Sequence, residues 1–179
     1  VSTTMRARAT ASSSTSRIVG LNAPTRSRCV PGASHAPRTI GSVDVVVSGL
    51  VLNFVPDARG ALLEMRRVAR SGGCIGAYVW DYAGKMELMR HFWDEAVELD
   101  PRVRDLDEGI RFPLCGPDAL ETAFRGAGLD AVAVVPIDVP TRFVDFDDYW
   151  SPFLGGQGPA PAYAMSLDED ARIRLREHL

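Results

Sequence analysis

The sequence predicts an α/β fold, a sheet with flanking helices, because strand-like and helix-like segments alternate from Val43 onward. The clearest strand is residues 43–49, where four valines form a β-branched run. A helix is predicted next, from an N-cap at Asp57 to an end at Gly72-Gly73, because apolar residues recur there three and four positions apart. A second strand-like run, residues 74–80, completes a strand–helix–strand unit, which is typical of a parallel sheet covered by helices.

Composition limits the classes of function. A chain of 179 residues with 46% hydrophobic residues suits one globular domain. The net charge of -3 argues against nucleic acid as a partner, and no apolar run is long enough to cross a membrane. Cys29, Cys74 and Cys115 have neither the pairing of a disulfide framework nor the spacing of a metal site. We therefore expect a cytoplasmic protein without a bound metal; its oligomeric state is not predicted.

The first 42 residues differ from the rest. No acidic or aromatic residue precedes Asp44, while six arginines and many serines and threonines do. Such a segment buries too little apolar surface to offset the entropy of ordering, so we expect disorder there. The chain is accordingly divided into a low-complexity segment, residues 1–42, and a folded part, residues 43–179. A faint strand signal within the first segment spans Ser16–Asn22.

The strand at residues 43–49 has almost no polar residues, which predicts a strand covered on both faces. Ser48-Gly49 ends it, and the small residues there would let a ligand approach the backbone at the edge where α/β sheets bind ligands. Asp57 is the expected N-cap of the following helix, and Gly72-Gly73 its expected end.

A second amphipathic helix is predicted over residues 86–97 and ends before Pro101. Its apolar side is expected to be core, although some of its residues could line a pocket. Residues 102–109 are expected to form a surface loop or a short helix, and residues 118–124 a further helix. The apolar side of the helix before Pro101 consists of Met86, Met89, Phe92, Trp93, Ala96 and Val97.

The last third of the chain is expected to contain one strand and two helices. Residues 132–139 alternate in polarity, and Pro136 predicts that this strand lies at an edge. The aromatic residues of 146–150 predict a short helix that packs on the body or forms a lid. Residues 155–161 are predicted to be a loop. A capping box, Ser166-x-x-Glu169, predicts the start of the final helix.

Three consecutive segments resemble part of the class I S-adenosylmethionine-dependent methyltransferases. Residues 44–54 resemble strand four of that family, the motif that follows resembles helix D, and the strand after it resembles strand five. The type 11 group is especially similar, with Ser71 in place of its usual proline. A further segment, residues 148–161, resembles one found in a bacterial subgroup. The likeness covers residues 42–179, and the motif reads Glu64-Met65-x-Arg67-Val68-x-Arg70-x-Gly72-Gly73.

This resemblance implies a partial Rossmann-like methyltransferase sheet, S-adenosyl-L-methionine as cofactor and a small-molecule methyl acceptor. It implies no catalytic base: His91 is a lone histidine on a helix, which is more often a solvated surface residue. The residues implied at the cofactor are Ser48, Gly49, Leu50 and Asn53. Those implied at the substrate pocket are Trp80, Asp81, Tyr82, Phe92 and Trp150.

The family's glycine-rich first motif and the acidic residue of its second strand have no counterpart in residues 1–42. Codons for Pro37–Ser42 can be written so that the neighbouring frame reads Pro-Asp-Asp-Arg-Phe, which resembles the family's lead into strand four. We therefore favour a reading-frame shift that ends near Ser42, with an organelle transit peptide or a basic binding tail as alternatives. Family members also have a strand after the last helix, so the chain is expected to be shortened at both ends.

Two functions stay open. The first is S-adenosylmethionine-dependent methyl transfer, with weak or no activity in this chain. Loss of the two hydrogen bonds from a ribose-binding carboxylate would weaken cofactor binding by roughly a hundredfold to ten-thousandfold. The second is an inactive remnant or interaction module of the same fold that binds no cofactor, with an unpaired edge at strand 43–49 that favours aggregation. A nicotinamide dehydrogenase is a distant third, since its glycine fingerprint is also absent.

Overall fold

The computed structural model describes residues 12–20 and 39–179, the first range by its backbone alone. Two compact units divide the chain. We name the first the sheet unit, with described residues 16–20, 39–81 and 112–137, and the second the helical unit, with described residues 12–15, 82–111 and 138–179.

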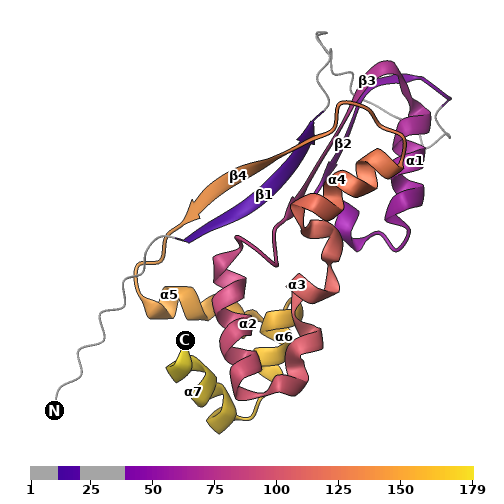
Figure 1. Ribbon diagram of the computed structural model, residues 1–179. Coiled ribbons are helices and arrows are strands. Elements are labelled where there is room, and N and C mark those ends of the chain that lie inside the picture. The colour runs from indigo at the N-terminus through magenta and orange to yellow at the C-terminus, as the bar shows by residue number, and fades with distance from the viewer. Residues whose placement is uncertain (1–11, 21–38) are drawn as a thin grey trace. The chain divides into compact units, whose positions relative to one another are not determined.

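The strands are β1 (Ser12–Gly20), β2 (Val43–Gly49), β3 (Ala69–Trp80) and β4 (Ala133–Thr141), and they form one sheet in the order β2-β3-β1-β4 (Figure 1). β2 is parallel to β3, with Gly49 opposite Tyr78, and β1 is antiparallel to β3. β4 lies at an edge, as its central proline predicts. Together with the helices this sheet confirms the α/β fold class.

One strand lies inside the segment that we expected to be disordered. Ser12–Gly20 is β1, and Ser16 lies opposite Trp80 of β3. It overlaps the faint strand signal that begins at Ser16. Residues 39–42 of the segment are also described, and the amides of Gly41 and Ser42 donate to the carbonyl oxygens of Arg67 and Val68. Its remaining residues, 1–11 and 21–38, lie outside the described residues.

β2 corrects one prediction. Its valine run predicts a strand covered on both faces, yet Val45 and Val47 are 44% and 67% exposed. The reason is the strand order: among the described residues β2 pairs only with β3, so it is an edge strand. A valine run reports β propensity, whereas burial depends on neighbours that the run does not specify.

The helix after β2 begins as predicted but ends earlier. Asp57 caps α1 (Ala58–Val68), because its Oδ1 accepts a hydrogen bond of 2.8 Å from the amide of Gly60. The predicted end at Gly72-Gly73 is wrong, since α1 stops at Val68 and β3 follows directly. Gly72, with φ of 74°, instead lies in a bulge of β3, where the register against β2 shifts.

The rest of the sheet unit consists of the 3-10 turns Leu52–Phe54 and Pro113–Cys115 and of helix α4 (Pro117–Gly126), which confirms the helix predicted at residues 118–124. α1 packs against β3 and α4. The largest side chains buried in this unit are Leu52, Leu62, Ile75, Val79, Leu120 and Phe124.

The helical unit is built around α2 (Glu87–Leu99), which ends before Pro101 as predicted. Its apolar side is core: Phe92 and Phe153 stack with ring centroids 4.4 Å apart. The other elements are the 3-10 segments Pro101–Leu106 and Ser151–Gly155 and helices α3 (Glu108–Arg111), α5 (Phe146–Trp150), α6 (Pro159–Ser166) and α7 (Glu169–His178).

Two predictions near the C-terminus are corrected. Residues 155–161 are not all loop, because α6 begins at Pro159, where proline is compatible with a first helical turn. The capping box at Ser166 does not form: its hydroxyl donates to the carbonyl oxygen of Tyr163 at 2.7 Å. Asp168 caps α7 instead, and its carboxylate accepts from the amide of Ala171 at 2.8 Å.

Candidate functional site

The carboxyl end of β2 is the best-defined candidate site. The last link of the β2–β3 ladder is a hydrogen bond of 2.9 Å from the amide of Leu50 to the carbonyl oxygen of Tyr78. Leu50 then adopts a φ of 54°, a left-handed conformation that is unfavourable for a residue with a side chain. Such strain is concentrated at functional sites, where the surrounding structure holds it in place.

Ser48 and Gly49 precede this turn in the ladder, opposite Ala77 and Tyr78. A Cβ at Gly49 would overlap the Tyr78 hydroxyl, so glycine here gives the tyrosine ring its space. Both predicted residues therefore lie at the end of β2, next to the strained turn.

Asn53 is the polar group of this turn that most requires a partner. It lies in the 3-10 turn Leu52–Phe54, and its side-chain oxygen and nitrogen are both buried. Neither atom has a hydrogen-bond partner among the described residues. An unpaired buried polar group costs about 1–3 kcal/mol, so its presence in a folded protein requires an explanation such as a bound ligand.

Asp81 also follows a strand at this edge of the sheet. β2 and β3 are parallel and Gly49 lies opposite Tyr78, so Asn53 and Asp81 come shortly after the carboxyl ends of neighbouring strands. Asp81 is buried. Burial, and to a smaller extent the Asp81 charge, raise the pKa of the Cys115 thiol to about 12. Cys115 is therefore a neutral core residue at physiological pH and not a nucleophile.

The residues predicted to line the substrate pocket are divided between the two units. Trp80 and Asp81 belong to the sheet unit, whereas Tyr82, Phe92 and Trp150 belong to the helical unit. Phe92 and Trp150 are buried in the helical core. For Phe92 this is the core role expected for the helix before Pro101, and for Trp150 it is the packing alternative predicted for residues 146–150. Their participation in a common substrate pocket stays a prediction.

A buried polar cluster in the helical unit was not predicted from the sequence. The indole Nε1 of Trp93 donates to Glu108, and Arg90 Nη1 donates to Asp107 at 2.9 Å. Desolvation raises the pKa of Glu108, an effect that hydrogen bonds from its own backbone, Trp93 and the Ala160 amide oppose. In the sequence, two adjacent acidic residues between short helical segments are typical of a solvent-exposed surface. The burial of Asp107 and Glu108 was therefore not predicted.

Within residues 12–20 and 39–179, no group of three or more histidine, cysteine, aspartate or glutamate side chains is arranged to hold a metal ion. No helix of this described part has the length and apolar character needed to cross a bilayer. His91 is exposed on α2, as expected for a solvated histidine.

A family model described as a methyltransferase domain matches residues 1–76. This match is consistent with a class I methyltransferase-like domain. The matched range contains β2, the turn through Leu50 and Asn53, α1 and the first part of β3. It confirms the likeness seen between Asp44 and Gly73. Comparisons with curated proteins and with solved structures gave no match.

The match to the methyltransferase domain begins at Val1, whereas our sequence analysis placed residues 1–42 outside the domain. The boundary at residue 42 and the reading-frame shift behind it stay predictions. The match ends at Gly76, so the likeness of residues 148–161 to a bacterial subgroup also stays a prediction.

Proposed function

We propose that this methyltransferase-like domain transfers a methyl group from S-adenosyl-L-methionine to a small-molecule acceptor. The observation that carries the proposal is the unpartnered amide of Asn53 beside the strained turn at Leu50. Both follow a strand that is parallel to its neighbour, at the sheet edge where open α/β folds bind ligands.

The chain's residues fit a nucleoside-containing cofactor at this edge. The Asn53 amide offers both a donor and an acceptor, which suits the polar edge of a base or a ribose. Leu50 offers an apolar contact, and the backbone of Ser48-Gly49 can be approached closely. When bound, the cofactor supplies a methyl group on a positively charged sulfur.

The protein's part in such a reaction is mainly to hold two molecules in line, which lowers the barrier through proximity and orientation. Asp81 follows the neighbouring strand and is the carboxylate best placed to accept a hydrogen bond from an acceptor hydroxyl or amine. We assign it an orienting role and assign no general base. Cys115 is a buried free thiol, which supports a reducing, cytoplasmic location for the protein.

The test is calorimetric titration of the 179-residue chain with S-adenosylhomocysteine, with circular dichroism to establish folding. We expect binding that is detectable at or below millimolar ligand, and binding weaker by about tenfold or more for Asn53→Ala, because two hydrogen bonds are lost. Val51→Ala, an exposed position in the same turn, is the matched control and should bind as the wild type does.

The second candidate function is an interaction module without a cofactor, which the exposed edge of β2 favours. The same titration separates the two candidates. A folded chain that binds no S-adenosylhomocysteine at millimolar concentration would refute the methyltransferase proposal and support the module.

A further inference from the structure

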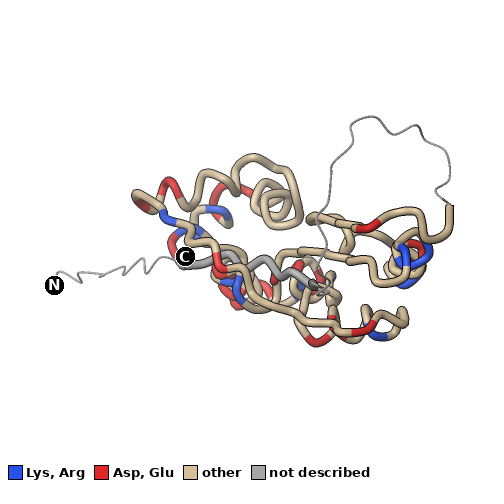
Figure 2. The backbone as a smooth tube through the Cα atoms, turned by 90° about the horizontal axis from the view of Figure 1, so that it is seen from above, with Lys and Arg blue, Asp and Glu red and all other residues tan. Residues whose placement is uncertain are grey.

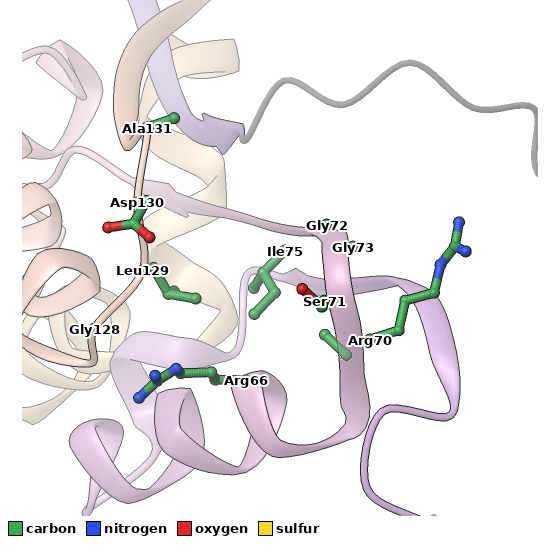
Figure 3. Close-up of a pocket in the computed structure, with 11 residues that line it drawn as sticks. Arg66, Arg70, Ser71, Gly72, Gly73, Ile75, Gly128, Leu129, Asp130 and Ala131 are labelled. Atoms are coloured by element: carbon green, nitrogen blue, oxygen red, sulfur yellow. The ribbon is translucent and has the colours of Figure 1, made fainter.

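A hollow of about 460 Å³ lies on the sheet unit at the amino-terminal end of β3 (Figure 3). Three segments line it: the end of α1, the first residues of β3 and the loop between α4 and β4. Because the proposed cofactor edge follows the carboxyl ends of β2 and β3, this hollow is at the opposite end of these strands. Its volume falls in the range of small-molecule pockets, about 300–1,000 Å³.

We propose that this hollow binds a small zwitterion, a molecule with one carboxylate, one ammonium group and an apolar body, such as an α-amino acid with an aliphatic side chain. Nothing in the proposed methyl transfer requires this site. The proposal rests on three features of the lining: an apolar floor, one cation held at the rim and one carboxylate on the same rim.

The floor is formed by aliphatic side chains. Ile75 is 1% exposed and Leu129 is half-buried, and both extend into the hollow in Figure 3. Ala69 adds a further apolar surface. Because Ile75 is already buried, an aliphatic ligand group would remove apolar surface from water mainly by covering Leu129 and Ala69.

The cation is Arg66. Its Nη1 donates to the carbonyl oxygen of Ala127 at 3.3 Å, which leaves the other guanidinium N–H groups for a ligand. Gly128 makes room for this guanidinium: its φ is 74°, and a Cβ there would be 2.9 Å from Arg66 Nη1. The arginine head group thus lies against the loop that lines the hollow.

The second arginine of the lining does not serve the hollow. Arg70 forms an ion pair with Asp44, and its side chain points away from the hollow in Figure 3. Lys and Arg positions are mixed with Asp and Glu positions over most of the described chain but gather at α1 (Figure 2). Two of these arginines are paired, Arg67 with Glu64 and Arg70 with Asp44, so we do not expect a general attraction for anions.

The carboxylate is Asp130, in the loop on the other side of Leu129 from Gly128. It is exposed and forms no hydrogen bond or ion pair with the described part of the chain. A plain anion bound at Arg66 would be repelled by this carboxylate, whereas an ammonium group on the same ligand would be attracted to it. The pair of opposite charges thus selects a zwitterion over an anion.

The test is NMR titration of the 179-residue chain with L-leucine and two analogues. The first, 4-methylpentanoate, lacks the ammonium group, and the second, isoamylamine, lacks the carboxylate. We expect L-leucine to shift the amide signals of residues 71–73 and 129–131. We expect each analogue to bind about fivefold more weakly, because each loses one exposed charge pair.

Substitutions test which charged side chain binds which group of the ligand. Asp130→Asn should weaken the binding of L-leucine but not that of 4-methylpentanoate. Arg66→Gln should weaken the binding of both of these ligands but not that of isoamylamine. Arg66→Lys keeps the charge and should retain most of the binding, which guards against a folding defect in Arg66→Gln. Arg70→Gln is the matched control and should leave all three titrations unchanged.

Three results would overturn the proposal: no shifts in the two segments at tens of millimolar L-leucine, equal binding of all three probes, or an Arg70→Gln effect as large as that of Arg66→Gln. None of these measurements involves the cofactor. Failure here and failure of the methyltransferase proposal are therefore distinguishable.

Discussion

Leu50 and Tyr78 share the last backbone hydrogen bond of the β2–β3 ladder, with the Leu50 amide as donor at 2.9 Å, and Leu50 leaves the ladder in the left-handed region at φ of 54°. The hydrogen bond anchors the strained residue to the neighbouring strand. The strain is thus located where the chain turns from β2 toward Asn53.

This relationship predicts opposite responses to two substitutions at Leu50. Leu50→Ile should lower the free energy of unfolding by about 1–2 kcal/mol, because a β-branched residue tolerates positive φ poorly. Leu50→Gly should stay within about 1 kcal/mol of the wild type, because relief of the strain offsets lost packing and added chain entropy. Urea denaturation measures both, and equal losses would show that φ at this residue is not limiting.

Asn53 should display a trade-off between stability and binding. Asn53→Leu replaces a buried, unpartnered amide with an apolar group of similar shape, so the free energy of unfolding should rise by about 1–3 kcal/mol. Binding of S-adenosylhomocysteine should fall at the same time. Thermal unfolding and calorimetry on one preparation measure the two effects. A less stable variant would mean that the amide has a structural partner.

Glu108 should make stability depend on pH in a direction that is unusual for a carboxylate. Desolvation raises its pKa above the ordinary 4.5, so the folded state holds the proton more tightly than the unfolded state. Its contribution is fully present below the unfolded pKa and is lost as pH rises through the folded pKa.

Glu108→Gln stays neutral and can still accept from Trp93, so it should flatten this dependence and gain stability over the wild type as pH rises above 4.5. The measurement is urea denaturation across pH 4 to 8. Glu98→Gln, on the exposed side of α2, is the control, and its free energy of unfolding should depend on pH as that of the wild type does. If the free energy of unfolding of Glu108→Gln also followed the pH dependence of the wild type, Glu108 would not be the source of that dependence.

Local signals were readable from the sequence because their partners lie within one helical turn. The side chain of Asp57 caps α1 by accepting a hydrogen bond from the amide of Gly60, only three residues later. The apolar side of α2 could be predicted from the spacing of apolar residues within the helix itself. The capping box at Ser166 failed for a local reason, since Asp168 is a competing cap closer to the helix.

Features that depend on distant partners were not readable. Glu108 reads as a surface acid, and only the fold brings Trp93 and the Ala160 amide to it. The edge position of β2 follows from the strand order, which its valines do not specify. At the candidate site, the position of Asn53 was predicted by resemblance, but its unpartnered amide became visible only in the structure.

The exposed edge of β2 should drive self-association. Val47 is 67% exposed on a strand that pairs on one side only among the described residues, and no lysine or proline interrupts this strand. Val47→Lys places a charge at this edge and should shift the chain toward monomer in sedimentation velocity at high concentration. Because position 47 is exposed, the free energy of unfolding of Val47→Lys should differ from that of the wild type by no more than about 0.5 kcal/mol.

The other edge strand provides the control for this prediction. Val135 of β4 is 50% exposed, but Pro136 beside it has no amide to donate, so this edge is already a poor template for strand pairing. Val135→Lys should therefore leave the sedimentation profile unchanged. If it restores the monomer as well as Val47→Lys does, the β2 edge is not responsible, because both variants change the net charge of the chain equally.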